Sequence, residues 1–388
     1  MKEGLQAEQL EKWCSFSDIW RSISGFFRTW KKAKGKKHEF LSHPALNYRS
    51  VPIGALLWPS VRFFIIVELA QSYRLCQALK NYFKSHAPVA IKLWGGISLR
   101  EGHLAWKSLD PQNIPLIFFY AVGAYIDWLY EEPNSPIDLL FVAGENHKKK
   151  ALRSNTIPSA NIEICGQARY DGLDDFKKKY NAERSRIELK IPRRFTMHVF
   201  LDTGYIIRGF LSTQEQVTIT SFLLKFASEH PSVALIIKPH PAHKVGILES
   251  LIDTHALKNV FLVDKNTLPY HALNAADMLI TKFSTLGIEA MLFKCSVISC
   301  IFDGEKRFNI YENAADYIDR IENLEDLLLN LVSDNGFRQE WHERHMQMQK
   351  AFLAEYFCEV KGSPSVYQAN ILDRYLRYHK EKNGYVRK

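Results

Sequence analysis

Two segments in the second half of the chain place polar side chains directly after apolar runs. Residues 233–241 read Val-Ala-Leu-Ile-Ile-Lys-Pro-His-Pro, and residues 276–292 pass from Ala-Asp-Met-Leu-Ile-Thr into Lys-Phe-Ser-Thr-Leu-Gly-Ile-Glu-Ala-Met-Leu. Ammonium, imidazole and hydroxyl groups can all hold phosphate. Ligands of open α/β sheets bind where strands end and helices begin. The two segments therefore predict a site for a phosphate-bearing ligand such as a nucleotide.

The first segment offers Lys238 and His240. The flanking prolines fix φ and stiffen the loop, so the His240 side chain is held in one direction. Its imidazole could donate a hydrogen bond to phosphate, and Lys238 could add charge. The structural alternative is a turn histidine that bonds only to the backbone.

The second segment offers Ser284 and Thr285 at a predicted helix start, where hydroxyls and free N–H groups form a phosphate cradle. Simple N-capping is the alternative, and both roles can coexist. Glu289, one turn further on, could accept hydrogen bonds from a ribose or only support the helix start. Thr203 and Gly204 follow another predicted strand and could line the same cleft.

Strand-like runs alternate with helical patterns in both halves of the chain. This alternation predicts parallel βαβ units and an α/β fold of two Rossmann-like domains. The charged stretch 177–194 is interpreted as the interdomain linker. The expected strands lie near residues 88–93, 114–120, 137–142, 162–164, 197–201, 233–237, 260–263, 278–280 and 296–301.

These motifs resemble the C-terminal domain of GT-B glycosyltransferases. The similarity is greatest to enzymes of bacterial surface-polysaccharide synthesis that use CMP- or CDP-activated donors, such as sialyl- and polysialyltransferases and CDP-glycerol glycerophosphotransferases. The segments Phe-Val-Ala-Gly-Glu at 141–145 and Ile-Glu-Ile-Cys-Gly-Gln-Ala-Arg-Tyr-Asp at 162–171 extend the likeness into the first half. The resemblance covers roughly residues 85–375.

The resemblance implies a GT-B fold, with two domains facing a cleft, and a role for each motif. His240 would contact the donor phosphate, Ser284 and Thr285 would bind the mono- or diphosphate, and Glu289 would face the nucleotide. Such enzymes need no metal or other cofactor, and the nucleotide-activated sugar is the donor substrate. The implied organisation is an amphipathic segment 1–40, an acceptor domain 41–185, a donor domain 186–345, and a helical tail 346–388 that crosses back.

The chain departs from these relatives at the end of one strand. Where relatives carry Gln-His-Gly, the sequence reads Phe-Tyr-Ala-Val-Gly at 119–123, so the usual acceptor-activating histidine is absent. Transfer to a hydroxyl still requires a base. Glu101, His103 and Asp127 are the candidates, and for each a structural role is the alternative.

The first forty residues combine an aromatic stripe with a basic run. Trp13, Phe16, Trp20, Phe27 and Trp30 recur at helical spacing, and five lysines lie between positions 31 and 37. This pattern over residues 13–37 favours the headgroup region of an anionic membrane, and a helix packed on the protein's own core is the alternative. The run 51–70 contains Pro59, Arg62 and Glu68, so no membrane span is expected there.

Net charge, the N-terminal sequence and the cysteine spacing limit the functions that the chain could have. The net charge of +9 indicates an attraction to polyanions, but no nucleic-acid-binding module is recognisable. No signal peptide and no paired cysteine motif is evident, which predicts a cytoplasmic enzyme at the inner face of the membrane. The expected activity is transfer from a nucleotide-activated donor to a glycan or lipid-linked glycan. An epimerase or hydrolase on the same fold, or a non-catalytic basic scaffold, are the alternatives.

Overall fold

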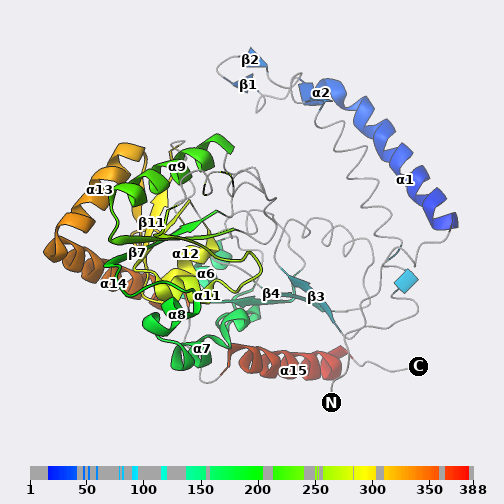
Figure 1. The fold of residues 1–388 in the computed structure, drawn as a ribbon. Coiled ribbons are helices and arrows are strands. Elements are labelled where there is room, and N and C mark those ends of the chain that lie inside the picture. Colours follow the sequence, from blue (N-terminus) through cyan, green and yellow to red (C-terminus); the bar gives the residue numbers. More distant parts are fainter. Residues whose placement is uncertain are drawn as a thin grey trace.

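The computed structural model describes residues 16–41, 47–48, 51–52, 58–59, 78, 81–82, 90–94, 115–119, 137–153, 158–203, 213–239, 250, 252, 257–282, 284–302, 310–357 and 363–383. It is a mixed α/β protein with two parallel sheets and a helical C-terminal region (Figure 1). The predicted fold class is therefore confirmed. Most of the run 51–70 lies outside the described residues.

The first sheet contains four parallel strands in chain order. They are β3 (Ile91–Trp94), β4 (Leu116–Phe119), β5 (Leu139–Val142) and β6 (Ile162–Ile164). Every residue of β5 is buried, as expected for a central parallel strand covered on both faces. Helix α6 (Glu145–Arg153) follows β5, and two 3₁₀ turns, η3 (Ser159–Asn161) and η4 (Ala168–Tyr170), flank β6.

The second sheet has six parallel strands in the order β12-β11-β10-β7-β8-β9. Strands β8 and β9 lie on one side of β7, and β10, β11 and β12 lie on the other, so the order reverses between β7 and β10. This is the doubly wound arrangement, in which ligands bind beside the reversal point at the carboxyl ends of the strands. The strands are β7 (Met197–Asp202), β8 (Val233–Lys238), β9 (Val260–Leu262), β10 (Met278–Thr281), β11 (Ser296–Cys300) and β12 (Asp316–Ile318).

Alternate residues along the strands of the second sheet are buried on its two opposite faces. Phe200, Ile236 and Leu279 face one core, whereas Val199 and Ile280 face the other. Helices α11 (Tyr270–Ala275), α12 (Thr285–Leu292) and α14 (Asn335–Tyr356) cover the first face, and α9 (Thr213–Glu229) and α13 (Ile321–Ser333) cover the second.

The predicted linker contains helices. Helix α7 (Leu173–Lys179) and helix α8 (Ala182–Glu188) occupy much of the charged stretch 177–194. Their inward residues Leu173 and Ser185 are buried, while most of the charges face solvent. The charge pattern had predicted only a linker here, whereas the structure contains two short helices.

The C-terminal chain consists of two long helices. Helix α14 runs unbroken through residues 345 and 346, the expected start of the tail. Helix α15 (Pro364–Asn383) packs Ile371 against Ile117, Leu139 and Phe141 of the first sheet (Figure 1). The last helix thus returns to the first half of the molecule.

At the N-terminal end, α1 (Phe16–Gly35) and α2 (Lys37–Leu41) lie apart from both sheets (Figure 1). A short antiparallel pair, β1 (Asn47–Tyr48) and β2 (Val51–Pro52), follows. No helix among the described residues is long and apolar enough to cross a membrane.

Candidate nucleotide site

The carboxyl ends of β7, β8 and β10, together with the start of α12, form what we call the carboxyl edge. Residues 202–203, 238 and 281–282 end these strands, and Ser284 precedes α12. The Thr281 hydroxyl donates to Asp202 Oδ2 at 3.1 Å, directly across the reversal point between β7 and β10. Two predicted motifs of the second half therefore meet at the place where this sheet type binds ligands.

Helix α12 begins as its sequence predicted. Ser284 is its N-cap, with Oγ accepting a hydrogen bond from the Leu286 N–H at 3.1 Å. This cap fixes the helix start, and the N–H groups of the first turn point toward the carboxyl edge. Ser284 and Thr285 are half-buried, so both lie at the surface of this edge.

Gly287, in the first turn of α12, has a packing role. A Cβ at this position would lie 2.5 Å from the ring of Tyr311, which is completely buried. The Tyr311 hydroxyl also donates to the Ser284 carbonyl. The glycine thus admits an aromatic ring that braces the start of α12.

Two buried lysines lie at this edge. Lys238 donates from Nζ to the Lys265 carbonyl at 3.0 Å, and burial lowers its pKa although Asp202 and Asp264 oppose the shift. Lys282 is 3 % exposed and lies 3.5 Å from Glu215 Oε1. Lys282 was not among the predicted site residues. Its place immediately after a buried strand was the only sequence signal for it.

The Thr203 hydroxyl is buried and donates to the Lys238 carbonyl at 3.4 Å. This contact joins the ends of β7 and β8. Gly204 and His240 lie outside the described residues, as do the three candidate bases Glu101, His103 and Asp127.

Among the residues that the structure describes, Glu289 is the one deeply buried carboxylate of the carboxyl edge, with its side chain 3 % exposed. Arg169 of η4 lies 2.6 Å from Oε1, and the described residues supply no hydrogen bond to Oε2. Burial raises the pKa of Glu289, Arg169 opposes that rise, and the charge of Asp202 adds to it. Among the described residues, Arg169 is thus the group that favours the ionised form of this carboxylate.

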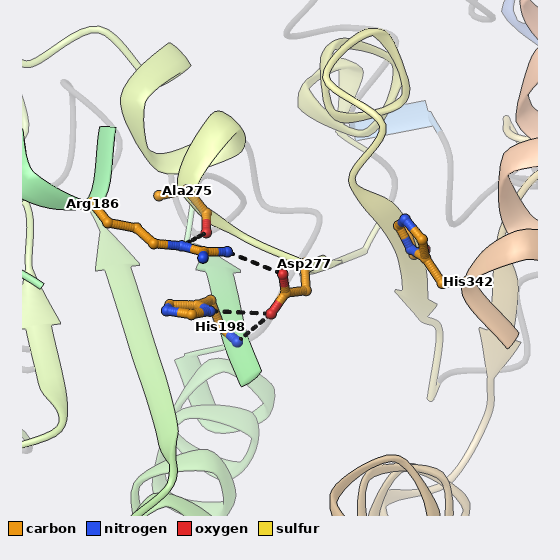
Figure 2. Close-up of polar contacts among 6 residues, drawn as sticks. Arg186, His198, Ala275, Asp277 and His342 are labelled. Carbon is orange, nitrogen blue, oxygen red and sulfur yellow. Dashed lines mark hydrogen bonds and ion pairs between the residues drawn. The ribbon is translucent and has the colours of Figure 1, made fainter. Parts of the chain in front are cut away.

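A different polar cluster lies at the opposite end of the same strands, and we call it the amino edge. The Asp277 carboxylate accepts from the His198 N–H at 2.7 Å and from Arg186 Nη2 at 3.1 Å, and it lies 3.1 Å from His198 Nδ1 (Figure 2). Arg186 also donates to the Ala275 carbonyl (Figure 2). These contacts tie α8 to β7 and to the start of β10.

The two histidines of the sequence Trp-His-Glu-Arg-His at 341–345 have separate partners. His342 Nδ1 lies 2.9 Å from Ser296 Oγ, and His345 Nε2 lies 3.2 Å from Asp316 Oδ2. Within the part of the chain that the structure describes, no three His, Cys, Asp or Glu side chains are grouped to hold a metal ion.

The fold is of the GT-B type, in which two Rossmann-like units are joined by a returning C-terminal helix. No protein-family model matches the chain, and no curated protein matches it in sequence.

Solved structures with this fold include nucleotide-sugar enzymes. S. aureus MnaA in complex with UDP aligns with a TM-score of 0.57 at 14 % identity, over 79 % of this chain and 81 % of that one. UDP-GlcNAc 2-epimerase from Neisseria meningitidis, bound to UDP-GlcNAc, aligns with a TM-score of 0.53 at 14 % identity, over 78 % and 81 %. A variant of the wall teichoic acid polymerase TagF soaked with CDPG aligns with a TM-score of 0.50 at 14 % identity, over 70 % and 71 %.

Proposed function

We propose that the protein is a glycosyltransferase that moves a sugar or sugar-like unit from a nucleotide-activated donor, CMP- or CDP-linked, to a hydroxyl of a surface glycan. The observation that carries this proposal is the Ser284-capped start of α12 beside the reversal point between β7 and β10. Helix N–H groups and the nearby lysines stabilise the charge of a departing phosphate. The sequence resemblance to transferases with cytidine-linked donors supports the choice of donor.

In this proposal His240, Lys238, Ser284 and Thr285 bind the donor phosphates, and Thr203 and Gly204 line the same edge. Glu289 accepts hydrogen bonds from the ribose. Glu101, His103 or Asp127 supplies the base, and neither a metal nor another cofactor takes part. Nucleic acid is not a partner.

The second candidate is an epimerase or hydrolase that acts on the donor alone. It is favoured by the likeness in fold to the UDP-GlcNAc 2-epimerase, which spans about four-fifths of both chains. The nucleotide site would be the same, and only the fate of the sugar would differ.

Incubation of CMP-, CDP- and UDP-linked donors with and without a glycan acceptor separates the two candidates. A transferase releases nucleotide only when the acceptor is present, whereas an epimerase or hydrolase alters the donor without it. If no donor is altered under either condition and no nucleotide binds, the non-catalytic scaffold takes precedence.

We further propose that α1 holds the enzyme at the inner face of the cytoplasmic membrane, where lipid-linked acceptors reside. Trp20 and Phe27 are each 59 % exposed, and Ile23 between them is 37 % exposed. At 100° per residue, these three side chains fall on one narrow stripe of the helix. Arg28, Lys31 and Lys32 are exposed beside it, which suits an anionic lipid surface.

Co-sedimentation of the full chain with vesicles tests this placement. Vesicles with anionic lipid should retain the protein. The double substitution Trp20→Ser with Phe27→Ser should weaken retention roughly tenfold, because it removes two aromatic side chains that would insert into the lipid surface. The control pair Leu268→Ser and Tyr378→Ser, 65 % and 62 % exposed elsewhere, should leave retention unchanged. Equal retention of all variants, or equal binding to neutral vesicles, would contradict the role of α1.

A further inference from the structure

The ion pair between Arg169 and Glu289 joins parts of the chain that belong to different sheets. Arg169 lies in η4, directly after the last strand of the first sheet, whereas Glu289 lies in α12 of the second. Their side chains are 38 % and 3 % exposed, and the closest atoms are 2.6 Å apart. A buried carboxylate thus receives its counter-charge from the other half of the molecule.

The segment that carries Arg169 is fixed on both sides. The Gly166 carbonyl accepts from Gln368 at 3.2 Å, and Asp171 accepts from the Ser363 hydroxyl at 2.7 Å and from the Ser365 N–H at 3.2 Å. Helix α15 is therefore bonded to both ends of the short stretch 166–171. Arg169 is presented to α12 by a rigid support.

Among the described residues, two charged groups act on the pKa of Glu289, and Arg169 is the one that favours the ionised form. Asp202 of β7 repels a second negative charge. Tyr170 of η4 and Tyr270 of α11 are phenols whose own pKa values are raised by burial and then by Glu289, so both stay neutral. Arg169 is the one described residue that supplies positive charge at this position.

The geometry leaves one carboxylate oxygen available. Arg169 engages Oε1, while Oε2 has no hydrogen bond from the described residues. An ionised carboxylate accepts hydrogen bonds from hydroxyl groups at each oxygen, whereas a protonated one loses part of that capacity.

We infer that Arg169 is a positioning residue for donor recognition, which keeps Glu289 ionised and oriented so that its second oxygen can accept a hydroxyl of the donor ribose. The inference rests on the proposed nucleotide site. It gives the segment after the first sheet an influence on nucleotide affinity that acts through Glu289, because loss of Arg169 would leave a buried carboxylate without its counter-charge.

The test is the pH dependence of CDP and UDP binding, measured by calorimetry on the full chain. The wild-type profile of affinity against pH should be the flatter one between about pH 5.5 and pH 8, because Arg169 opposes the rise in the pKa of Glu289 that burial causes. In Arg169→Gln the pKa of Glu289 rises further, so affinity should fall roughly tenfold toward the acid end and recover as the pH rises. Arg169→Lys restores a positive charge and should restore most of the flat profile.

Glu289→Gln is the matched control. It removes the titrating group, so binding should be weak at every pH, and adding Arg169→Gln should change nothing more. If Arg169→Gln does not fold, Arg169→Lys and Glu289→Gln decide the matter by the same profiles. A wild type that binds neither nucleotide contradicts the proposed function. If the wild type binds nucleotide, two results would overturn the role of Arg169. One is an unaltered pH profile in Arg169→Gln. The other is an Arg169→Lys variant that binds more weakly than the wild type by the same factor at every pH.

Discussion

Asp277 and Glu289 are acids at opposite edges of the same sheet, and they differ in how fully the protein satisfies them. Asp277 has three polar contacts from His198 and Arg186, which hold the pKa of its carboxyl below the usual value. Among the described residues, Glu289 has one cation, Arg169, and no hydrogen bond to its second oxygen, and burial raises its pKa. A carboxylate saturated by its own protein fixes structure, whereas a buried carboxylate with an unused oxygen is available to a ligand.

The largest expected effect comes from Gly287→Ala, which should disrupt the carboxyl edge. The new methyl group would meet the buried ring of Tyr311 at 2.5 Å, so either the ring or α12 must move. We expect a loss of about 3 kcal/mol in the free energy of unfolding, measured by urea denaturation, together with a loss of nucleotide binding.

Gly172→Ala is the control for this substitution, because a Cβ there meets nothing within 4 Å. It should alter the free energy of unfolding by less than about 1 kcal/mol. Unchanged stability and nucleotide affinity in Gly287→Ala would show that the start of α12 does not depend on the packing of Tyr311.

Asp277→Ala should break the amino edge and spare the site. It leaves Arg186 and His198 without their shared acceptor, but 37 % of the Asp277 side chain is open to solvent, which reduces the cost. We expect a loss of about 2 kcal/mol in unfolding free energy with nucleotide affinity unchanged. The exposed Asp326 on α13 provides the control, since Asp326→Ala should have almost no effect. Reduced nucleotide affinity in Asp277→Ala would erase the distinction between the edges.

Ser284→Ala should separate capping from binding. Loss of an N-cap costs about 1 kcal/mol of stability, and Asp334→Ala at the start of α14 removes an equivalent cap. Both variants should therefore have melting temperatures that are lower by similar amounts. Only Ser284→Ala should weaken nucleotide binding, by roughly fivefold. If both variants bind nucleotide as the wild type does, Ser284 is a helix cap alone.

The smallest expected effects are pH-dependent contributions to the free energy of unfolding, which have opposite signs at Asp277 and Glu289. The pKa of Asp277 is lower in the folded state, so its stabilisation is present above about pH 4 and is lost as the pH falls through the folded value. The pKa of Glu289 is raised, so its cost appears as the pH rises above about 4.5 and persists at neutral pH. At pH 7 we therefore expect Asp277→Asn to lower the unfolding free energy, and Glu289→Gln to leave it equal or raise it by less than about 1 kcal/mol. Urea denaturation at about pH 4 and at about pH 7 measures both changes in unfolding free energy. If both substitutions change it in the same direction at pH 7, the comparison is contradicted.

Local patterns in the sequence were enough to predict most of the second sheet. Largely apolar runs of three to six residues predicted β7, β8, β10 and β11, and the hydroxyls before α12 predicted its start. Strand β12 was missed because it has only three residues and begins with the charged Asp316. The short helices α7 and α8 were missed because charges outnumber their inward residues.

The pairings that distinguish the two edges could not be predicted from local patterns. Asp277 meets partners 79 and 91 positions earlier in the chain, and no periodicity of a single segment encodes such a contact. Arg169 likewise reaches Glu289 only because the two sheets are assembled side by side. The sequence placed Glu289 near the ligand, but the cation that governs its charge became evident only in the folded structure.

The central claim is that the carboxyl edge of the second sheet binds a nucleotide, and thermal stabilisation by CMP, CDP, UMP, UDP and GDP tests it most directly. The account predicts a rise in melting temperature with a cytidine nucleotide, abolished by His240→Ala and retained in Asp277→Asn. No shift with any nucleotide, or an equal loss in both variants, would contradict it.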